Sequence, residues 1–357
     1  MKYWRGYLTA AIFAGLTLAL QQFAKNYTKL LDMIYPYMTR MIQNLLSAWS
    51  SGFDFCLWQV LAGVVVVLLI ASIVVMVALK WNFFQWLGWV LAFVSIGFCL
   101  HTGIYGLNTY CGPLSEDIRL NVTEFTITEL VGATTYYRDK ANELSSQVPR
   151  DGEGNLQLPT FEEMAAEAGA GFQTLTHDRS YSVFGGETFP VKKLGMTDLF
   201  DSLGIHSYTA PITGESAVNP QLPGLALPYT MCYEMARRMS ISQDQDANLA
   251  AFLACQANSD PVFQYAAYLS AYRYCFNTLS GDSTSTAQNA AQNIQAGLNV
   301  FSQQDLQALD SDSDQEVCIL LVSWYIQEIY LPAHQDEVEK FDPLDPEQVE
   351  LDYTVGG

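Results

Sequence analysis

Three long apolar stretches dominate the first third of the chain. Residues 60–79, VLAGVVVVLLIASIVVMVAL, carry no charge over 20 positions, and about 20 apolar residues are needed for a helix to cross a ~30 Å hydrocarbon core. Residues 7–24 and 84–106 are similarly apolar. The first stretch lacks a small-x-small cleavage site, which favours an uncleaved helix over a signal peptide. The pattern therefore predicts three transmembrane helices, at about 7–24, 60–79 and 84–106.

The segment between the first two spans, residues 25–58, has a different pattern. An apolar stripe on a polar helix predicts an element that lies either on the bilayer or on the protein's own soluble domain. We expect a packing helix rather than a lipid-sensing one. The apolar residues recur at helical spacing and are Ile34, Tyr37, Met38, Met41, Leu45 and Trp49.

From residue 107 the pattern is typical of a mainly helical soluble domain. Helical apolar spacing runs through residues 118–144 and ends at the turn sequence PRDGEG. Glycines, prolines and β-branched residues between 181 and 223 predict loops with one or two short strands, and residues 207–213 are the best strand candidate. Further helices are expected at 161–172 and at 317–331, and two more within 281–314. Between them, one helix should begin at Pro228, the next at Ser242 or Asp244, and a third, the Tyr-rich one, should end at Leu279.

These patterns predict a mostly α (α+β) fold class, in which three N-terminal transmembrane helices precede a mainly helical domain with a small strand region. The chain then divides into a membrane domain at 1–106, a soluble domain at 107–331 and an acidic tail at 332–357, which we expect to be poorly ordered.

Charge is distributed as unevenly as hydrophobicity. Residues 1–106 hold six of the 17 Lys and Arg and two of the 37 acidic residues, so the remainder carries 11 basic and 35 acidic residues and a net charge of −24. Such a domain repels nucleic acid and anionic lipid surfaces. Nucleic acid is therefore excluded as a partner, whereas the predicted spans make the lipid bilayer one.

The positive-inside rule gives a close count, because each side of the predicted spans receives three basic residues. Short flanking segments weigh more than long loops, and the strongly acidic domain favours export. We therefore expect a multi-pass protein of the cell membrane with its N-terminus inside and residues 107–357 outside. The two groups of basic residues are Lys2, Arg5 and Lys80 on the inner side, and Lys25, Lys29 and Arg40 on the outer side.

Several motifs in the soluble domain resemble those of a known family. TGESAVN at 213–219, LPYTMCYEMARR at 227–238 and DQDANLAAFLAC at 244–255 are similar to T-G-E-x-N-V-N, H-E-x-A-H-Q and E-A-N-F. These patterns belong to a family of bacterial multi-pass membrane proteins of unknown function, whose extracytoplasmic domain is zinc-metallopeptidase-like, with a gluzincin-like HExxH motif. The Tyr-rich run at 262–274 and YGLN at 105–108 fit the same family.

The resemblance implies a zincin-like domain with a degenerate metal site. Tyr233 and Arg237 replace the family's two His ligands, Glu234 matches its catalytic Glu, and Asp246 replaces the Glu that precedes Ala-Asn. A phenol with a pKa near 10 is a poor zinc ligand, and a guanidinium has no lone pair to donate. We therefore expect no metal cofactor, and we expect Arg237 to pair with Glu234 and Asp246 in an ion-pair cluster.

Two more residues are candidates for a cleft beside this helix. Glu215 lies in the TGESAVN motif, and His206 directly precedes the predicted strand, from where it could approach Glu234. The resemblance implies that this strand runs along a substrate-binding cleft. The other histidines are scattered and form no pair with metal-ligand spacing.

The function predicted from these residues is that of a membrane-anchored pseudo-metallopeptidase without zinc, which binds or scaffolds a peptide or protein partner at the cell envelope. The alternative is an active metallopeptidase that holds zinc through Glu234, Asp246 and His206, or a metal-free hydrolase, with Glu234 as the general base. A third possibility is a diverged structural membrane protein. The seven cysteines form no C-x-x-C pair, and Cys232 and Cys255 are either buried free thiols or a disulfide between neighbouring helices.

Overall fold

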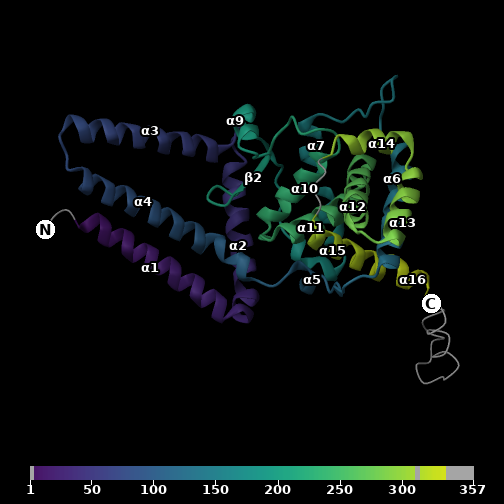
Figure 1. The fold of residues 1–357 in the computed structure, drawn as a ribbon. Helices are drawn as coiled ribbons and strands as arrows, with labels where there is room; N and C mark the ends of the chain where they lie inside the picture. Colours follow the sequence, from purple (N-terminus) through teal and green to yellow (C-terminus); the bar gives the residue numbers. More distant parts are fainter. Residues whose placement is uncertain (1–3, 310–313, 335–357) are drawn as a thin grey trace.

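The computed structural model describes residues 4–309 and 314–334, and Figure 1 shows its fold. Three N-terminal helices, α1 (Arg5–Asn26), α3 (Leu57–Ala78) and α4 (Phe83–Ile104), are long and apolar enough to cross a membrane. The three predicted spans are thus confirmed as helices. Beyond them the chain forms a mainly helical body, and α2 (Thr28–Ser50) lies between the two parts (Figure 1).

Helices α1 and α4 pack closely along one another (Figure 1). Two glycines permit this contact, because a Cβ on Gly6 would lie 2.5 Å from the carbonyl carbon of Gly88, and small residues let membrane helices approach. The Tyr7 hydroxyl also donates a hydrogen bond to the carbonyl of Phe84, at 2.8 Å. Helix α3 diverges from α4 towards the helical body (Figure 1), and Leu57 is its single buried residue.

Helix α2 packs through its polar side. Gln43 donates to the carbonyl of Pro211 at 3.0 Å, and Ser47 donates to the carbonyl of Gly214 at 2.6 Å. Its apolar stripe faces outward instead, with Tyr37 65% and Leu45 66% exposed. Helix α2 is thus a packing helix as expected, but it packs through its polar side and not through the apolar stripe. The stripe is exposed, and α2 itself lies at the ends of the three spans (Figure 1).

The helical body is built around α11 (Asp244–Ala257), which is buried over most of its length. Helices α10 (Ala226–Arg238), α12 (Pro261–Gly281) and α15 (Gln315–Tyr325) pack against it, and α6 (Ile127–Ser145) packs against α12. Aromatic rings fill the centre, among them Tyr137, Phe252, Tyr268 and Trp324. The Tyr-rich run at 262–274 therefore belongs mainly to the core.

Shorter elements surround this core. They are α5 (Leu114–Asp117), α7 (Phe161–Glu167), α8 (Ala170–Leu175), α9 (Thr197–Ser202), α13 (Ser285–Ala296), α14 (Val300–Gln307), α16 (Leu331–Ala333), the 3₁₀ segments η1 (Gly106–Tyr110) and η2 (Arg179–Phe184), and the π-helical η3 (Ile326–Tyr330).

Some element boundaries differ from the predicted ones. Helix α6 begins at Ile127 rather than 118, because Thr126 and Glu129 form a capping box there. The helix predicted at 161–172 is divided into α7 and α8. The two helices predicted within 281–314 are confirmed as α13 and α14. The predicted acidic tail lies outside the described residues, apart from residues 332–334.

A small three-stranded sheet covers one side of α10. Strand β3 (Glu215–Val218) lies between β1 (Lys192–Lys193), which is parallel to it, and β2 (Ser207–Ala210), which is antiparallel. Of the strand candidate at 207–213, residues 207–210 form β2, and the chain then turns through residues 211–214 into β3. The turn ends at Gly214. This residue has φ +66°, and a Cβ there would lie 2.6 Å from the amide nitrogen of Ser47, so a side chain would separate α2 from the sheet.

All seven cysteines are free thiols. Cys232 and Cys255 are both buried, which agrees with the free-thiol alternative rather than the disulfide.

Candidate functional site

Glu234 lies in the middle of α10 and is 3% exposed. Both of its carboxylate oxygens accept hydrogen bonds from strand β2: Ser207 donates to Oε1 at 2.6 Å and Thr209 donates to Oε2 at 2.5 Å. Burial raises the pKa of Glu234, and the two hydroxyl hydrogen bonds oppose that rise. The carboxyl group of Glu234 therefore joins α10, which we call the motif helix, to the sheet.

The backbone of α10 is held at the same point. The carbonyl oxygen of Glu234 accepts a hydrogen bond from the Ser216 hydroxyl, at 2.9 Å, and lies 3.0 Å from the hydroxyl oxygen of Thr209. Two neighbouring strands thus contact one residue of the helix, through its side chain and its carbonyl. Hydroxyl residues at alternate positions of a strand point to the same face, which is why Ser207 and Thr209 reach Glu234 together.

Tyr233 and Arg237 converge on the first residue of α11, Asp244. The Tyr233 hydroxyl donates to Asp244 Oδ1 at 2.9 Å, and the Arg237 guanidinium forms an ion pair with the same oxygen and donates to the Tyr233 hydroxyl at 3.2 Å. The predicted ion pairs of Arg237 with Glu234 and Asp246 are therefore wrong. Asp244 is the nearer acidic partner because it starts the next helix, directly after the turn.

Asp246 belongs to a different environment. It is buried, and its Oδ2 accepts the backbone N–H of Leu114 at 3.0 Å. Burial raises its pKa from 3.8 to about 6. Asp246 is thus buried with a hydrogen-bond partner, and this partner is a backbone amide and not Arg237.

Glu215 connects the sheet to the membrane part. Its carboxylate forms an ion pair with Lys192 at 2.7 Å and accepts the backbone N–H groups of Leu57, at 2.9 Å, and Trp58, at 2.8 Å. These two N–H groups are at the start of α3, where a helix has unpaired donors and a partial positive charge. Glu215 therefore anchors the second span and is not positioned beside Glu234.

His206 is exposed and lies next to Asp201, with Nδ1 3.1 Å from its Oδ1. Nothing in its hydrogen bonding connects it to Glu234. Within residues 4–309 and 314–334, no three His, Cys, Asp or Glu side chains come together as a potential metal site. The donor set around Glu234 does not fit zinc, because the Tyr233 phenol donates to Asp244 and Arg237 is a permanent cation.

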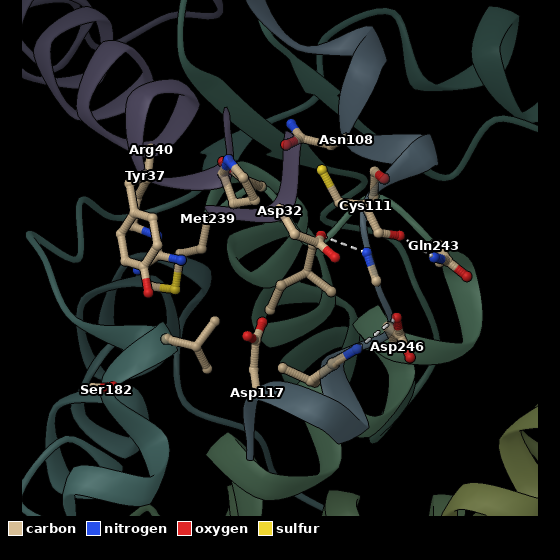
Figure 2. A pocket seen from close by; sticks show the side chains of 17 residues that line it. Asp32, Tyr37, Arg40, Asn108, Cys111, Asp117, Ser182, Met239, Gln243 and Asp246 are labelled. Carbon is tan, nitrogen blue, oxygen red and sulfur yellow. Dashed lines mark hydrogen bonds between the residues drawn. The ribbon is translucent and has the colours of Figure 1, made fainter. Parts of the chain in front are cut away.

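A polar cavity of about 120 Å³ lies between α2 and the turn that joins α10 to α11 (Figure 2). Asp246 lines this cavity and accepts no hydrogen bond from the residues around Glu234. Other lining residues include Asp32 and Arg40 from α2, Asn108 from η1 and Asp117 from α5. Burial raises the pKa of Asp117, and the Arg40 charge opposes the rise.

The comparison with protein families fits this architecture. The sequence profile of a family described as a protein of unknown function, DUF3810, matches residues 32–330. The chain belongs to the DUF3810 family. Curated proteins and solved structures gave no match. The DUF3810 match extends from α2 to η3, so it includes the two spans α3 and α4 together with the helical body.

Several residues of this DUF3810 site were not found from the sequence. Ser207 and Thr209 carried a signal, because hydroxyl residues alternate on the predicted strand. Asp244 carried one too, since it lies seven residues beyond Arg237. The partner of Glu215 gave no local signal, because Leu57 is 158 positions away.

Proposed function

We propose that this DUF3810 protein is a membrane-anchored pseudo-metallopeptidase that works without zinc and has a binding or scaffolding role at the cell envelope. The observation that supports this most directly is the engagement of both Glu234 oxygens by Ser207 and Thr209. A general base must reach a water or a substrate proton. A carboxylate that is buried and accepts two hydroxyls instead holds helix and strand together.

The residues around Glu234 support the same proposal. Zinc requires lone pairs from three protein ligands and an open fourth position. Here Arg237 places a fixed positive charge where a cation would be bound, and Asp244 balances it. Loss of the metal ligands leaves α10 as an architectural element.

A peptide or protein partner is consistent with the sheet. Strand β2 is at its edge, and an extended peptide can add to an edge strand through backbone hydrogen bonds. Tyr208 on this strand is 43% exposed, so its ring is available for contact with a partner.

We place the helical body outside the cell. The start of α1 and the turn between α3 and α4, which carries Lys80, lie at the ends of the spans far from the body (Figure 1). Each side carries three basic residues, but those in short flanking segments weigh more than those in the longer segment with Lys25, Lys29 and Arg40, which favours the cytoplasmic side for Lys80. A cysteine introduced by Asp198→Cys should react with an impermeant maleimide in intact cells, whereas one from Lys80→Cys should react only after lysis. The reverse labelling would contradict this orientation.

The proposal is tested by separating stability from activity at Glu234. We expect Glu234→Ala to destabilise the full-length protein in detergent by about 2–4 kcal/mol, since it leaves a cavity and two unpaired hydroxyls. Glu187→Ala, at an exposed position, serves as the control.

Peptidase and esterase assays supply the second readout. Wild type and Glu234→Gln should show the same background hydrolysis, because the carboxylate performs no proton transfer. If wild type hydrolyses peptides or esters and the folded Glu234→Gln variant does not, the alternative of an active enzyme with Glu234 as base replaces the proposal.

A further inference from the structure

Buried polar atoms without partners gather at the cavity between α2 and the α10–α11 turn. Asn108 is 3% exposed, and neither its amide nitrogen nor its amide oxygen has a hydrogen-bond partner among the described residues. The same holds for Nε of Arg40, which is 9% exposed, and for the hydroxyls of Ser240 and Ser242. All four residues line this cavity.

Such a concentration of unpaired groups requires an occupant. A buried donor or acceptor that stays unpaired costs about 1–3 kcal/mol, and most buried polar groups in proteins are paired. The cavity offers a guanidinium and an amide as donors, together with amide and hydroxyl oxygens as acceptors. An occupant that satisfies them must carry hydrogen-bonding groups of both kinds.

The charges of the lining specify the occupant further. Three carboxylates, from Asp32, Asp117 and Asp246, line the cavity together with a single guanidinium, from Arg40 (Figure 2). Asp32 and Asp246 each use one oxygen to accept a backbone N–H. The excess of carboxylates favours a cationic group, while the unpaired Nε of Arg40 favours an anionic acceptor. Both preferences are met by one molecule that carries both charges.

The volume limits the size of that molecule. An apolar cavity of about 150 Å³ holds benzene, so a cavity of about 120 Å³ takes an occupant of about five or six heavy atoms. Glycine and alanine have this size. A dipeptide is too large and carries its two charges too far apart.

We propose that this cavity binds a free zwitterion of the size of glycine or alanine, with its carboxylate at Arg40 and its ammonium group among Asp117 and Asp246. This cavity is separate from Glu234 and its partners Ser207 and Thr209. The inference goes beyond the proposed function and does not depend on it. Because Arg40 comes from α2 and Asp246 from α11, the ligand would connect α2 to the core of the helical body.

The test is calorimetric titration of the full-length protein in detergent with glycine, L-alanine and D-alanine. Ethylamine carries only the ammonium charge, propionate only the carboxylate, and dialanine tests the size limit. We expect at least one zwitterionic amino acid to bind at least tenfold more tightly than all three comparison compounds.

Variants then assign the binding to this cavity. Arg40→Gln and Asn108→Leu should each weaken amino-acid binding at least tenfold. Lys29→Gln, on the exposed side of the same helix, and Asp198→Asn, an exposed carboxylate on α9, should bind like wild type.

Three results would overturn the inference. Absence of binding by any amino acid at 10 mM, as a concentration on the order of the weakest specific affinities, would mean that water alone pairs these groups. Equal binding of ethylamine would indicate a simple cation site. Undiminished binding in a folded Arg40→Gln variant would place the ligand elsewhere, and if that variant does not fold, the comparison of ligands on wild type still decides.

Discussion

At the scale of single residues, the carboxyl groups of this protein are used as connectors. Glu234 joins α10 to β2, Asp244 joins α11 to Tyr233 and Arg237 on α10, and Glu215 joins the sheet to α3. Each accepts hydrogen bonds from groups distant in sequence. The acidity of the soluble domain therefore has an internal role as well as keeping its surface soluble.

The raised pKa of Asp246 gives a pH-dependent stability. Burial raises this pKa from 3.8 to about 6, so the native state binds the proton more tightly than the unfolded chain. The stabilisation is complete below about pH 4 and is lost as the pH rises through 6, with an upper limit of about 3 kcal/mol for a shift of this size.

Thermal unfolding of the full-length protein in detergent, followed from pH 4 to pH 7, measures this effect. The melting temperature of wild type should fall relative to that of Asp246→Asn as the pH rises. Parallel curves for the two proteins would show that the carboxyl titrates alike in the folded and unfolded states.

At the scale of elements, the sequence revealed local properties and missed those that depend on distant partners. The three spans follow from length and hydropathy alone, and so does the helical character of residues 107–331. The apolar stripe of α2 was visible too, but its direction was not, because Gln43 and Ser47 find their partners more than 160 residues away.

The motif helix shows the same limit at the site. Tyr233, Glu234 and Arg237 could be singled out from LPYTMCYEMARR. The pairing of Arg237 could not, because two acidic residues at the start of α11, Asp244 and Asp246, offered the same charge within reach. Helix geometry separates them, since positions two apart do not share a face.

The link between Glu215 and α3 predicts a mutational effect. Glu215→Gln removes the charge that pairs with Lys192 and weakens the acceptor of two N–H groups at the helix start. We expect a loss of about 2–4 kcal/mol, since breaking a buried ion pair leaves one charge uncompensated. Hydrogen exchange at Leu57 and Trp58 should become faster.

The matched control for this variant is Glu162→Gln, which removes an exposed ion pair with Lys193. Lys193 follows Lys192, the partner of Glu215, on strand β1. Exposed pairs contribute little to stability. Equal effects of the two substitutions would show that Glu215 does not hold α3.

The outward apolar stripe predicts that α2 lies in the bilayer interface. A spin label attached after Met41→Cys should be accessible to oxygen in the lipid, because Met41 is 58% exposed on that stripe. A label at Gln292→Cys, on the exposed side of α13, is the aqueous control. If both labels show the same aqueous accessibility, α2 is covered by protein or faces water.

At the scale of the whole molecule, the three spans, α2 and the helical body form a connected unit. Tyr105, just after α4, donates to the carbonyl of Arg237 on α10 at 2.7 Å, and α2 and α3 are tied to the sheet. Contacts thus cross the predicted boundary at residue 106, so experiments are best done on the full chain. The motif helix is the point where several of these connections meet.

The central claim, that the motif helix is architectural and does not hold zinc, is tested most directly by the metal content of the full-length protein. Elemental mass spectrometry should be applied to wild type and to Glu234→Ala after purification without chelators. We expect far less than about one zinc per chain in both proteins. About one zinc per chain in wild type, lost in Glu234→Ala, would contradict it and identify Glu234 as a ligand of a working metal centre.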